Sequence, residues 1–165
     1  MELKDEDFDL RLGKIESVIK QPSFFEKNGL SSEVGYYIFD YDPEYEMEVR
    51  EEIKRLKNIT VITNSLRIIN ELSNNEGIKT IAVGGVVSNN QSFVGYLAEN
   101  SIKNNFFAMK FFFSSKGVSP EAGIMESNDM ECAIKKQMLA NATEKYYLCD
   151  ASKIGRVGFY KLLPI

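Results

Sequence analysis

Short apolar runs alternate with amphipathic stretches along this chain, and that alternation is typical of strands connected by helices. The first amphipathic stretch, residues 8–20, repeats apolar side chains at helical spacing and predicts a helix that ends before Pro22. A connector over residues 21–32 follows it. The aromatic and β-branched run 34–39 then predicts the first strand.

Beyond this strand, helix and strand patterns continue in strict alternation. Asp42 as N-cap and Pro43 at the first helical position predict a charged helix that runs to about residue 57. Asn128 and Glu131 form an Asx version of a capping box for a later helix. The predicted strands are 59–62, 78–83, 107–113 and 145–149, with 157–162 suited to a further one, and the predicted helices follow Thr63-Asn64-Ser65, start at Ser92, and span 128–142.

Strands that are apolar on both faces and separated by single helices favour parallel pairing with right-handed crossovers. We therefore expect an α/β fold, a three-layer Rossmann-like parallel sheet with helices on both faces. The 165 residues fit one domain, comprising an N-terminal helix and connector (1–32), a strand-loop-helix unit (33–57) and the remainder (58–165).

Composition narrows the possible functions. With 44% apolar and 27% charged residues the chain is neither disordered nor a disulfide scaffold, and no apolar run approaches the ~20 residues of a membrane helix. The acidic start is unlike a signal peptide, so we expect a cytoplasmic protein without membrane contact. The absence of histidine excludes His-dependent nucleophilic catalysis and His-ligated zinc, and we expect no metal, cofactor or catalytic residues.

Charge is unevenly distributed between two parts of the chain. Residues 1–57 carry 15 acidic and 9 basic side chains, whereas residues 58–165 carry 9 and 11. Because DNA binding requires many Lys and Arg contacts to phosphates, a net charge of −4 without a basic cluster predicts no direct nucleic-acid binding.

Polar and small residues follow the predicted strands. In an open parallel sheet, ligands bind at the carboxyl ends of the strands, where backbone N–H groups and lysines suit an anion such as a sugar phosphate. The segments at these ends are Asp40-Tyr41-Asp42, Thr63-Asn64-Ser65, Gly84-Gly85, Ser114-Ser115-Lys116-Gly117 and Asp150-Ala151-Ser152-Lys153.

Each segment also has a structural interpretation. The Thr63 triplet would also suit helix capping, and two glycines would also form a tight turn. Asp40 and Asp42 would suit a metal or proton transfer, although Asp42 already serves as an N-cap. Glu131 and Lys135, spaced i,i+4, would form a surface ion pair unless they line the site.

The second part of the chain resembles a known family. ITVITNSLRIINELSN, IKTIAVGG, SFVGYLAENSI, FFFSSKGVSPEAGIMESNDMECAIKKQMLANA and YYLCDASKIGRVGFYKL together resemble the C-terminal sensor domain of DeoR-family sugar-metabolism repressors, from about residue 58 to the end. The resemblance implies a fold similar to ribose-5-phosphate isomerase and glucosamine-6-phosphate deaminase and a phosphorylated-sugar effector. It implies a pocket formed by Thr63, Asn64, Gly84, Gly85, Ser115, Lys116, Gly117, Asp150 and Lys153.

The first third departs from that family. Residues 1–57 contain no helix-turn-helix, and IFDYDPEYE stands where the family carries a phosphate-binding loop, so its carboxylates would repel a phosphate. LGKIESVIKQPSFFEKNGLSSEVGYYIFDYDPEYEMEVREEIKRL instead resembles the start of BrxB-like proteins of BREX phage-defence systems. We therefore hypothesise a chimera of two α/β fragments.

The leading interpretation is an effector-sensing, sugar-phosphate-binding domain of a DeoR-type regulator without its DNA-binding domain, in a chain that forms a homo-oligomer. The alternatives are a recombined scaffold with little function of its own, an isomerase- or deaminase-like enzyme, and a BREX defence component.

Overall fold

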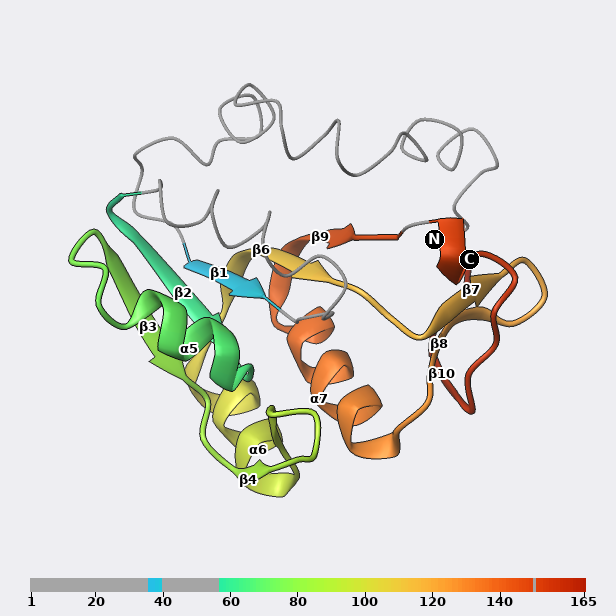
Figure 1. Cartoon of the computed structure of the whole chain (residues 1–165), viewed down its shortest axis with the longest axis horizontal. Coiled ribbons are helices and arrows are strands. Elements are labelled where there is room, and N and C mark those ends of the chain that lie inside the picture. Colours follow the sequence, from blue (N-terminus) through green and yellow to red (C-terminus); the bar gives the residue numbers. More distant parts are fainter. Residues whose placement is uncertain (1–35, 40–56, 150) are drawn as a thin grey trace.

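A parallel sheet of five strands forms the centre of the molecule in the computed structural model, which describes residues 36–39, 57–149 and 151–165 (Figure 1). Its order is β3-β2-β1-β6-β9, and every neighbouring pair is parallel. The α/β class predicted from the sequence is therefore confirmed. The strands are β1 (Tyr36–Phe39), β2 (Ile59–Thr63), β3 (Ile78–Ala82), β6 (Ala108–Phe113) and β9 (Ala142–Tyr147).

β1 occupies the middle of this sheet. Ile38 is in register with Ile62 of β2 on one side and with Phe111 of β6 on the other. The sheet order reverses direction between β1 and β6, because β2 and β3 extend it one way and β6 and β9 the other. Such a reversal marks where ligands bind in open α/β sheets. The predicted helices over 8–20 and 42–57 lie outside the described residues.

Both faces of the sheet are covered at β2. Val61 and Ile62 are neighbours on β2, so their side chains point to opposite faces, and both are fully buried. Three helices connect the described strands, α5 (Leu66–Leu72), α6 (Tyr96–Asn105) and α7 (Asp129–Ala140). α6 and α7 pack side by side and share one core with Ile62 and Phe111. The finer likeness to a Rossmann-like or isomerase fold stays a prediction.

A small antiparallel sheet stands beyond the carboxyl ends of β6 and β9, at the right of Figure 1. It contains β7 (Gly117–Ser119), β8 (Gly123–Glu126) and β10 (Tyr160–Leu163), and the short helix η2 (Ala151–Lys153) precedes β10. The predicted strand over 157–162 thus belongs to this sheet and not to the parallel one. Gly158 allows this pairing, since a Cβ there would lie 2.3 Å from the carbonyl oxygen of Glu126.

The helix predicted to start at Ser92 begins four residues later. Ser92 lies in a hairpin between β4 (Val86–Val87) and β5 (Phe93–Val94), where its carbonyl accepts a 2.8 Å bond from Ser88 N. Gly95, with φ of 86°, then turns the chain into α6. The prediction was wrong because Ser92 already uses its main chain to hold the hairpin.

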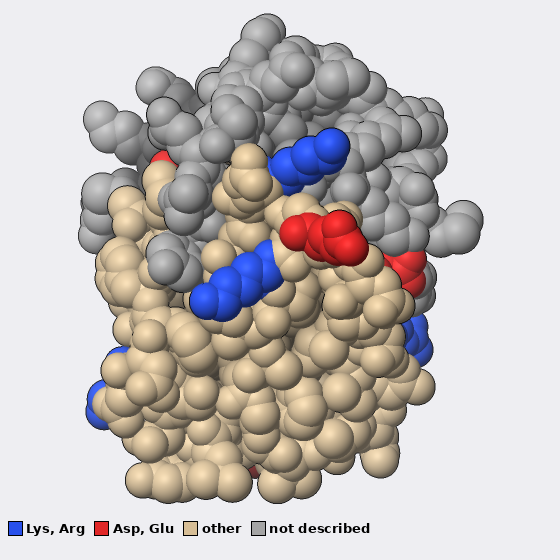
Figure 2. Space-filling view, turned by 90° about the vertical axis from the view of Figure 1, so that its left-hand side faces the viewer, with Lys and Arg blue, Asp and Glu red and all other residues tan. Residues whose placement is uncertain are grey.

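The surface seen from the β3 side carries few charged side chains (Figure 2). They are of both signs, and no basic patch gathers on the described part of this face. Among the described residues, no helix combines the length and the apolar character needed to cross a membrane.

Candidate functional site

Buried polar side chains gather at the carboxyl ends of the parallel strands and on the elements that cover these ends. Buried polar groups require hydrogen-bond partners, so their contacts define what this region can do. The members are Thr63, Asn64, Ser65, Ser92, Ser114, Ser115, Glu126, Glu131, Lys135 and Lys153.

The end of β2 divides its three polar residues between two roles. Thr63 Oγ1 accepts a 3.1 Å bond from Ser65 N, and Ser65 Oγ accepts one of 3.4 Å from Ile68 N at the start of α5. These two residues shape and cap the helix start. Asn64 instead faces the hairpin. Its side-chain Nδ2 donates to Phe93 O at 3.3 Å, and its main-chain carbonyl oxygen accepts a hydrogen bond from Phe93 N at 2.7 Å.

The paired glycines after β3 bring the hairpin close to α6. Gly84 and Gly85 have φ of 74° and 119°, a region that favours glycine. A Cβ on Gly85 would lie 2.8 Å from Val94 O and 2.9 Å from Ala98 Cβ, so only glycine fits this approach. Val83 N bonds to Thr63 O at 3.2 Å, which places the glycines beside the end of β2.

Glu131 joins the hairpin to α7. Its Oε1 accepts hydrogen bonds from Ser92 Oγ at 2.5 Å and from Ser88 Oγ at 3.2 Å. Asn128 caps α7 as predicted, with its Oδ1 accepting from Glu131 N at 3.1 Å. The Glu131 side chain does not complete the expected capping box, because it is directed to the serines instead.

Lys135, one helical turn further along α7, joins this helix to β8 and to the end of β6. Its Nζ lies 2.5 Å from Glu126 Oε1 and 2.9 Å from the carbonyl oxygen of Ser114. The surface ion pair considered for Glu131 and Lys135 is therefore wrong, because both are buried and each binds another element.

The segment after β6 contributes two buried serines, Ser114 and Ser115, and one exposed lysine. Ser115 Oγ is hydrogen-bonded to Gly117 O at 3.1 Å and to Tyr147 Oη at 2.7 Å. Burial raises the pKa of the Tyr147 phenol well above its usual range. The side chain of Lys116 is exposed, while its main chain pairs with Met125. Gly117 serves packing, since a Cβ there would lie 2.3 Å from Arg156 O.

Lys153 is the buried lysine of the short helix that follows β9 in the chain. It is only 7% exposed, in η2, and Gly155 N bonds to Val118 O at 2.8 Å, which fastens the end of η2 to β7. The predicted site residues Asp40, Asp42 and Asp150 lie outside the described residues.

The structure links several predicted site residues through groups that the sequence analysis did not select. Asn64 holds Phe93, Ser92 binds Glu131, and Lys135 on the same helix reaches Ser114 beside Ser115. Ser88, Ser92, Glu126 and Tyr147 were the residues missed. The sequence did indicate that Glu131 and Lys135 are buried, because their spacing places them on the same face of α7 as the apolar residues Ile134 and Met138.

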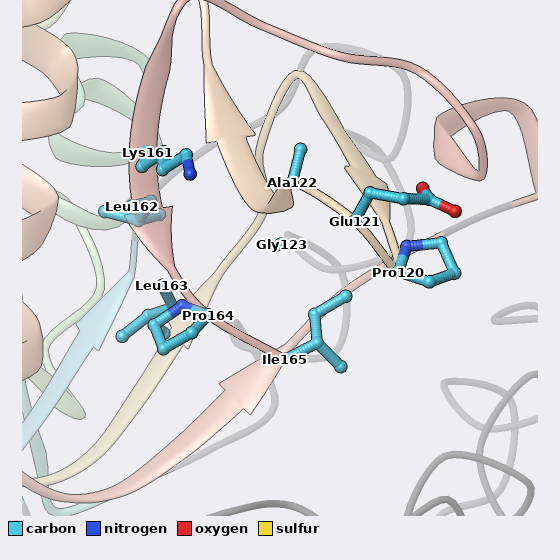
Figure 3. A pocket seen from close by; sticks show the side chains of 9 residues that line it. All are labelled: Pro120, Glu121, Ala122, Gly123, Lys161, Leu162, Leu163, Pro164 and Ile165. Carbon is cyan, nitrogen blue, oxygen red and sulfur yellow. The ribbon is translucent and has the colours of Figure 1, made fainter.

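A separate hollow of about 230 Å³ lies at the β7–β8 turn and the end of β10, away from these residues (Figure 3). In this hollow, Ile165 faces Pro120 and Glu121. Lys161 lies on the side of the hollow away from Pro120 and Glu121. None of the predicted site residues lines this hollow, whose lining comprises Pro120, Glu121, Ala122, Gly123, Lys161, Leu162, Leu163, Pro164 and Ile165.

Chemically, the strand-end region offers different groups on its two sides. The Asn64 amide and the Glu131 carboxylate bind the β4–β5 hairpin, through Phe93 and Ser92, whereas Lys153 lies in η2, whose end is held to β7. Amide and carboxylate oxygens accept hydrogen bonds from hydroxyl groups, and ammonium groups bind anions. Within the described ranges, no three His, Cys, Asp or Glu side chains come together as a metal-binding group.

Comparison with known proteins yields a family match. Residues 46–165 match the family described as DeoR C terminal sensor domain, and this match begins earlier than the boundary expected near residue 58. The chain is 37% identical over 102 residues to the uncharacterized HTH-type transcriptional regulator YulB of Bacillus subtilis, covering 61% of this chain and 39% of that protein. It is 34% identical over 107 residues to the L-fucose operon activator of Haemophilus influenzae, covering 64% and 43%.

The chain thus spans about two fifths of the length of these curated relatives. A further similarity is to the BREX protein BrxB of Bacillus cereus, 56% identical over 52 residues, which covers 29% of this chain and 27% of that protein.

Proposed function

Because this chain belongs to the DeoR C terminal sensor domain family, we propose that it senses a phosphorylated sugar at the carboxyl ends of its parallel strands. One relative is an L-fucose operon activator, and its name links that protein to a sugar operon. The domain type is shared with such regulators, while the effector, and the activity of any whole regulator, belong to the proposal.

The buried polar cluster at the strand ends is the observation that supports this function. Ligands of open parallel sheets bind at the carboxyl ends, at the point where strand order reverses. Here that point lies between β1 and β6, and Ser114 and Ser115 follow β6 directly. The cluster contains hydroxyls, an amide, two carboxylates and two lysines, of which Lys135 is paired with Glu126, so it suits a small polar ligand better than an apolar one.

The proposed pocket keeps the residues chosen from the sequence, with roles that follow their positions. Asn64 and Lys153 are the buried polar contacts, and Lys116 reaches the ligand from the exposed side. Glu131 and Lys135 position the hairpin and β8. The remaining members are Thr63, Gly84, Gly85, Ser115, Gly117 and Asp150.

Several further properties belong to the same proposal. We expect no catalysis, no direct contact with nucleic acid, a cytoplasmic location and assembly into a homo-oligomer. The exposed side chain of Tyr96 at the start of α6 suits a contact between copies.

A panel of phosphorylated sugars tests the proposal. Ribose 5-phosphate, fructose 1-phosphate, glucose 6-phosphate and glucosamine 6-phosphate are added to the protein, and the melting temperature is measured. We expect a subset to raise it. Lys153→Ala should abolish that rise because it removes a buried cation, and Lys116→Ala should reduce it less because its exposed charge is screened by water.

Lys103→Ala is the matched control, since Lys103 is an exposed lysine in the last turn of α6. If Lys103→Ala and Lys153→Ala lost the ligand-induced rise in melting temperature equally, the rise would depend only on the overall charge of the protein. That result would contradict the proposed site. Turnover of any panel member would favour the isomerase- or deaminase-like enzyme.

A second candidate is a recombined scaffold, a chimera of two α/β fragments with little function of its own. The 56% identity to BrxB over 52 residues favours it, because that value exceeds the identities to the two regulators named above. No shift with any sugar phosphate would support the scaffold, whereas one family alignment running without interruption across residues 30–80 would remove it.

A further inference from the structure

Asn64 carries a buried acceptor without a donor. Its side chain is fully buried, yet Oδ1 has no hydrogen-bond partner among the described residues. Leaving a buried carbonyl oxygen unpaired is unfavourable, and such atoms in native proteins usually have a partner. An unpaired polar atom at the end of a central strand is where a ligand would supply that partner.

The orientation of this amide is fixed by its other atom. Nδ2 donates to the carbonyl oxygen of Phe93 at 3.3 Å, and a flipped amide would place two acceptors against each other there. The unpaired atom is therefore the oxygen, which only accepts hydrogen bonds.

We infer that Asn64 Oδ1 accepts a hydrogen bond from a hydroxyl group of the bound sugar, and that the phosphate lies at the opposite end of the site, toward Lys153. This inference rests on the proposed function and assigns the direction in which the ligand lies. A phosphate dianion has only acceptor oxygens, so it cannot satisfy Asn64 Oδ1, whereas every sugar hydroxyl can.

Charge on the two sides of the site agrees with this direction. Glu131 accepts a 2.5 Å bond from Ser92, the residue next to the Phe93 that Asn64 holds, so a carboxylate lies on the Asn64 side. Like charges repel, and a phosphate would be disfavoured here. Lys153 lies in η2, which follows β9 in the chain and whose end is held to β7, the strand that follows β6.

The test compares sugar phosphates with inorganic phosphate. Dissociation constants are measured for each panel sugar that binds, for its monodeoxy analogues and for inorganic phosphate, in the wild type and in Asn64→Ala. We expect Asn64→Ala to weaken the sugar phosphate about tenfold, the effect of one lost hydrogen bond, and to leave inorganic phosphate within about twofold. One monodeoxy analogue should bind the wild type about tenfold more weakly and should bind both proteins equally.

Thr80→Val is the matched control. Thr80 Oγ1 is the other buried side-chain atom without a partner among the described residues, but it lies inside β3 and not at a strand end. Its replacement should leave every dissociation constant unchanged. A loss in Thr80→Val equal to that in Asn64→Ala would overturn the inference.

If Asn64→Ala does not fold, the inference can still be tested on the wild type by NMR. The side-chain amide resonances of Asn64 should move on addition of the sugar phosphate and stay in place with inorganic phosphate. Movement with inorganic phosphate, or an unchanged sugar affinity in Asn64→Ala, overturns the inference while the proposed function stands. Absence of binding by every sugar phosphate overturns both.

Discussion

Lys135 and Glu126 form a buried ion pair between α7 and β8, with 2.5 Å between Nζ and Oε1 and each side chain only 8% exposed. Removing one partner leaves the other charge buried without compensation. We expect Lys135→Met to lower the free energy of unfolding by about 3–5 kcal/mol, measured by urea denaturation. The main-chain carbonyl of Ser114 would lose a donor in the same variant.

Two comparisons isolate this pair. Lys136→Met changes the exposed neighbour on the same helix and should alter stability by less than about 0.5 kcal/mol. The double variant Lys135→Met/Glu126→Leu should recover part of the loss, because it no longer buries a lone carboxylate. If the double variant lost as much unfolding free energy as the two single variants lose together, Lys135 and Glu126 would not be coupled.

Tyr147 gives the protein a dependence on alkaline pH. Burial raises the pKa of its phenol above the usual value near 10, so the folded state keeps the proton where the unfolded state loses it. The stability that comes from this shift is full below about pH 10 and is lost as pH rises through the folded pKa. In urea denaturation, Tyr147→Phe should be less stable by about 1 kcal/mol at pH 8, since it loses the Ser115 bond.

That deficit should shrink at pH 10.5, because phenylalanine has no proton to lose and only the wild type is destabilised by the shift. Ultraviolet absorbance of tyrosinate in the folded protein gives an independent reading. A deficit that stays constant between the two pH values would show that Tyr147 ionises as freely in the folded state as in the unfolded one.

At the scale of elements, β2 and β6 were predictable because burial on both faces makes their sequences mostly apolar. The strand predicted over 145–149 is displaced from β9 (Ala142–Tyr147), because exposed polar residues at the start of β9 hide the strand pattern. The predictions for 59–62, 78–83 and 107–113 agree with β2, β3 and β6 to within one residue at each end. The shorter antiparallel strands were not predictable. β4 and β5 have two residues each and β7 has three, too few for an alternating pattern, and their pairing comes from tertiary contacts.

The candidate site shows the same division between local and tertiary information. Thr63, Asn64 and Gly85 could be selected because their position after a strand is visible in the sequence. Glu126 could not, since its role depends on β8, a strand that the sequence did not reveal, and on Lys135 reaching it from α7. Spacing of i,i+4 along a helix shows that two residues share a face, but whether that face is buried depends on what packs against it.

At the scale of the whole molecule, the most acidic part of the chain supplies the centre of the sheet. β1 lies before residue 46, where the family match begins, yet it pairs with β2 over all four of its residues and with β6 over three. A segment that resembles another protein would therefore be integral to the fold and not an appended tail. The chimera hypothesis requires this strand to be compatible with both neighbours.

Proline at Ile38 tests that integration in the intact chain. Ile38 is in register with strands on both sides, and proline has no N–H to donate to either ladder. We expect Ile38→Pro to lower the free energy of unfolding by about 1–3 kcal/mol, measured by urea denaturation, because a ladder hydrogen bond is lost and its acceptor is left unpaired. Ile38→Val, which keeps the N–H and a β-branched side chain, should be clearly less destabilising than Ile38→Pro. If Ile38→Pro were as stable as Ile38→Val, β1 would not hold the sheet together, and β2 and β6 would have to be stable without it.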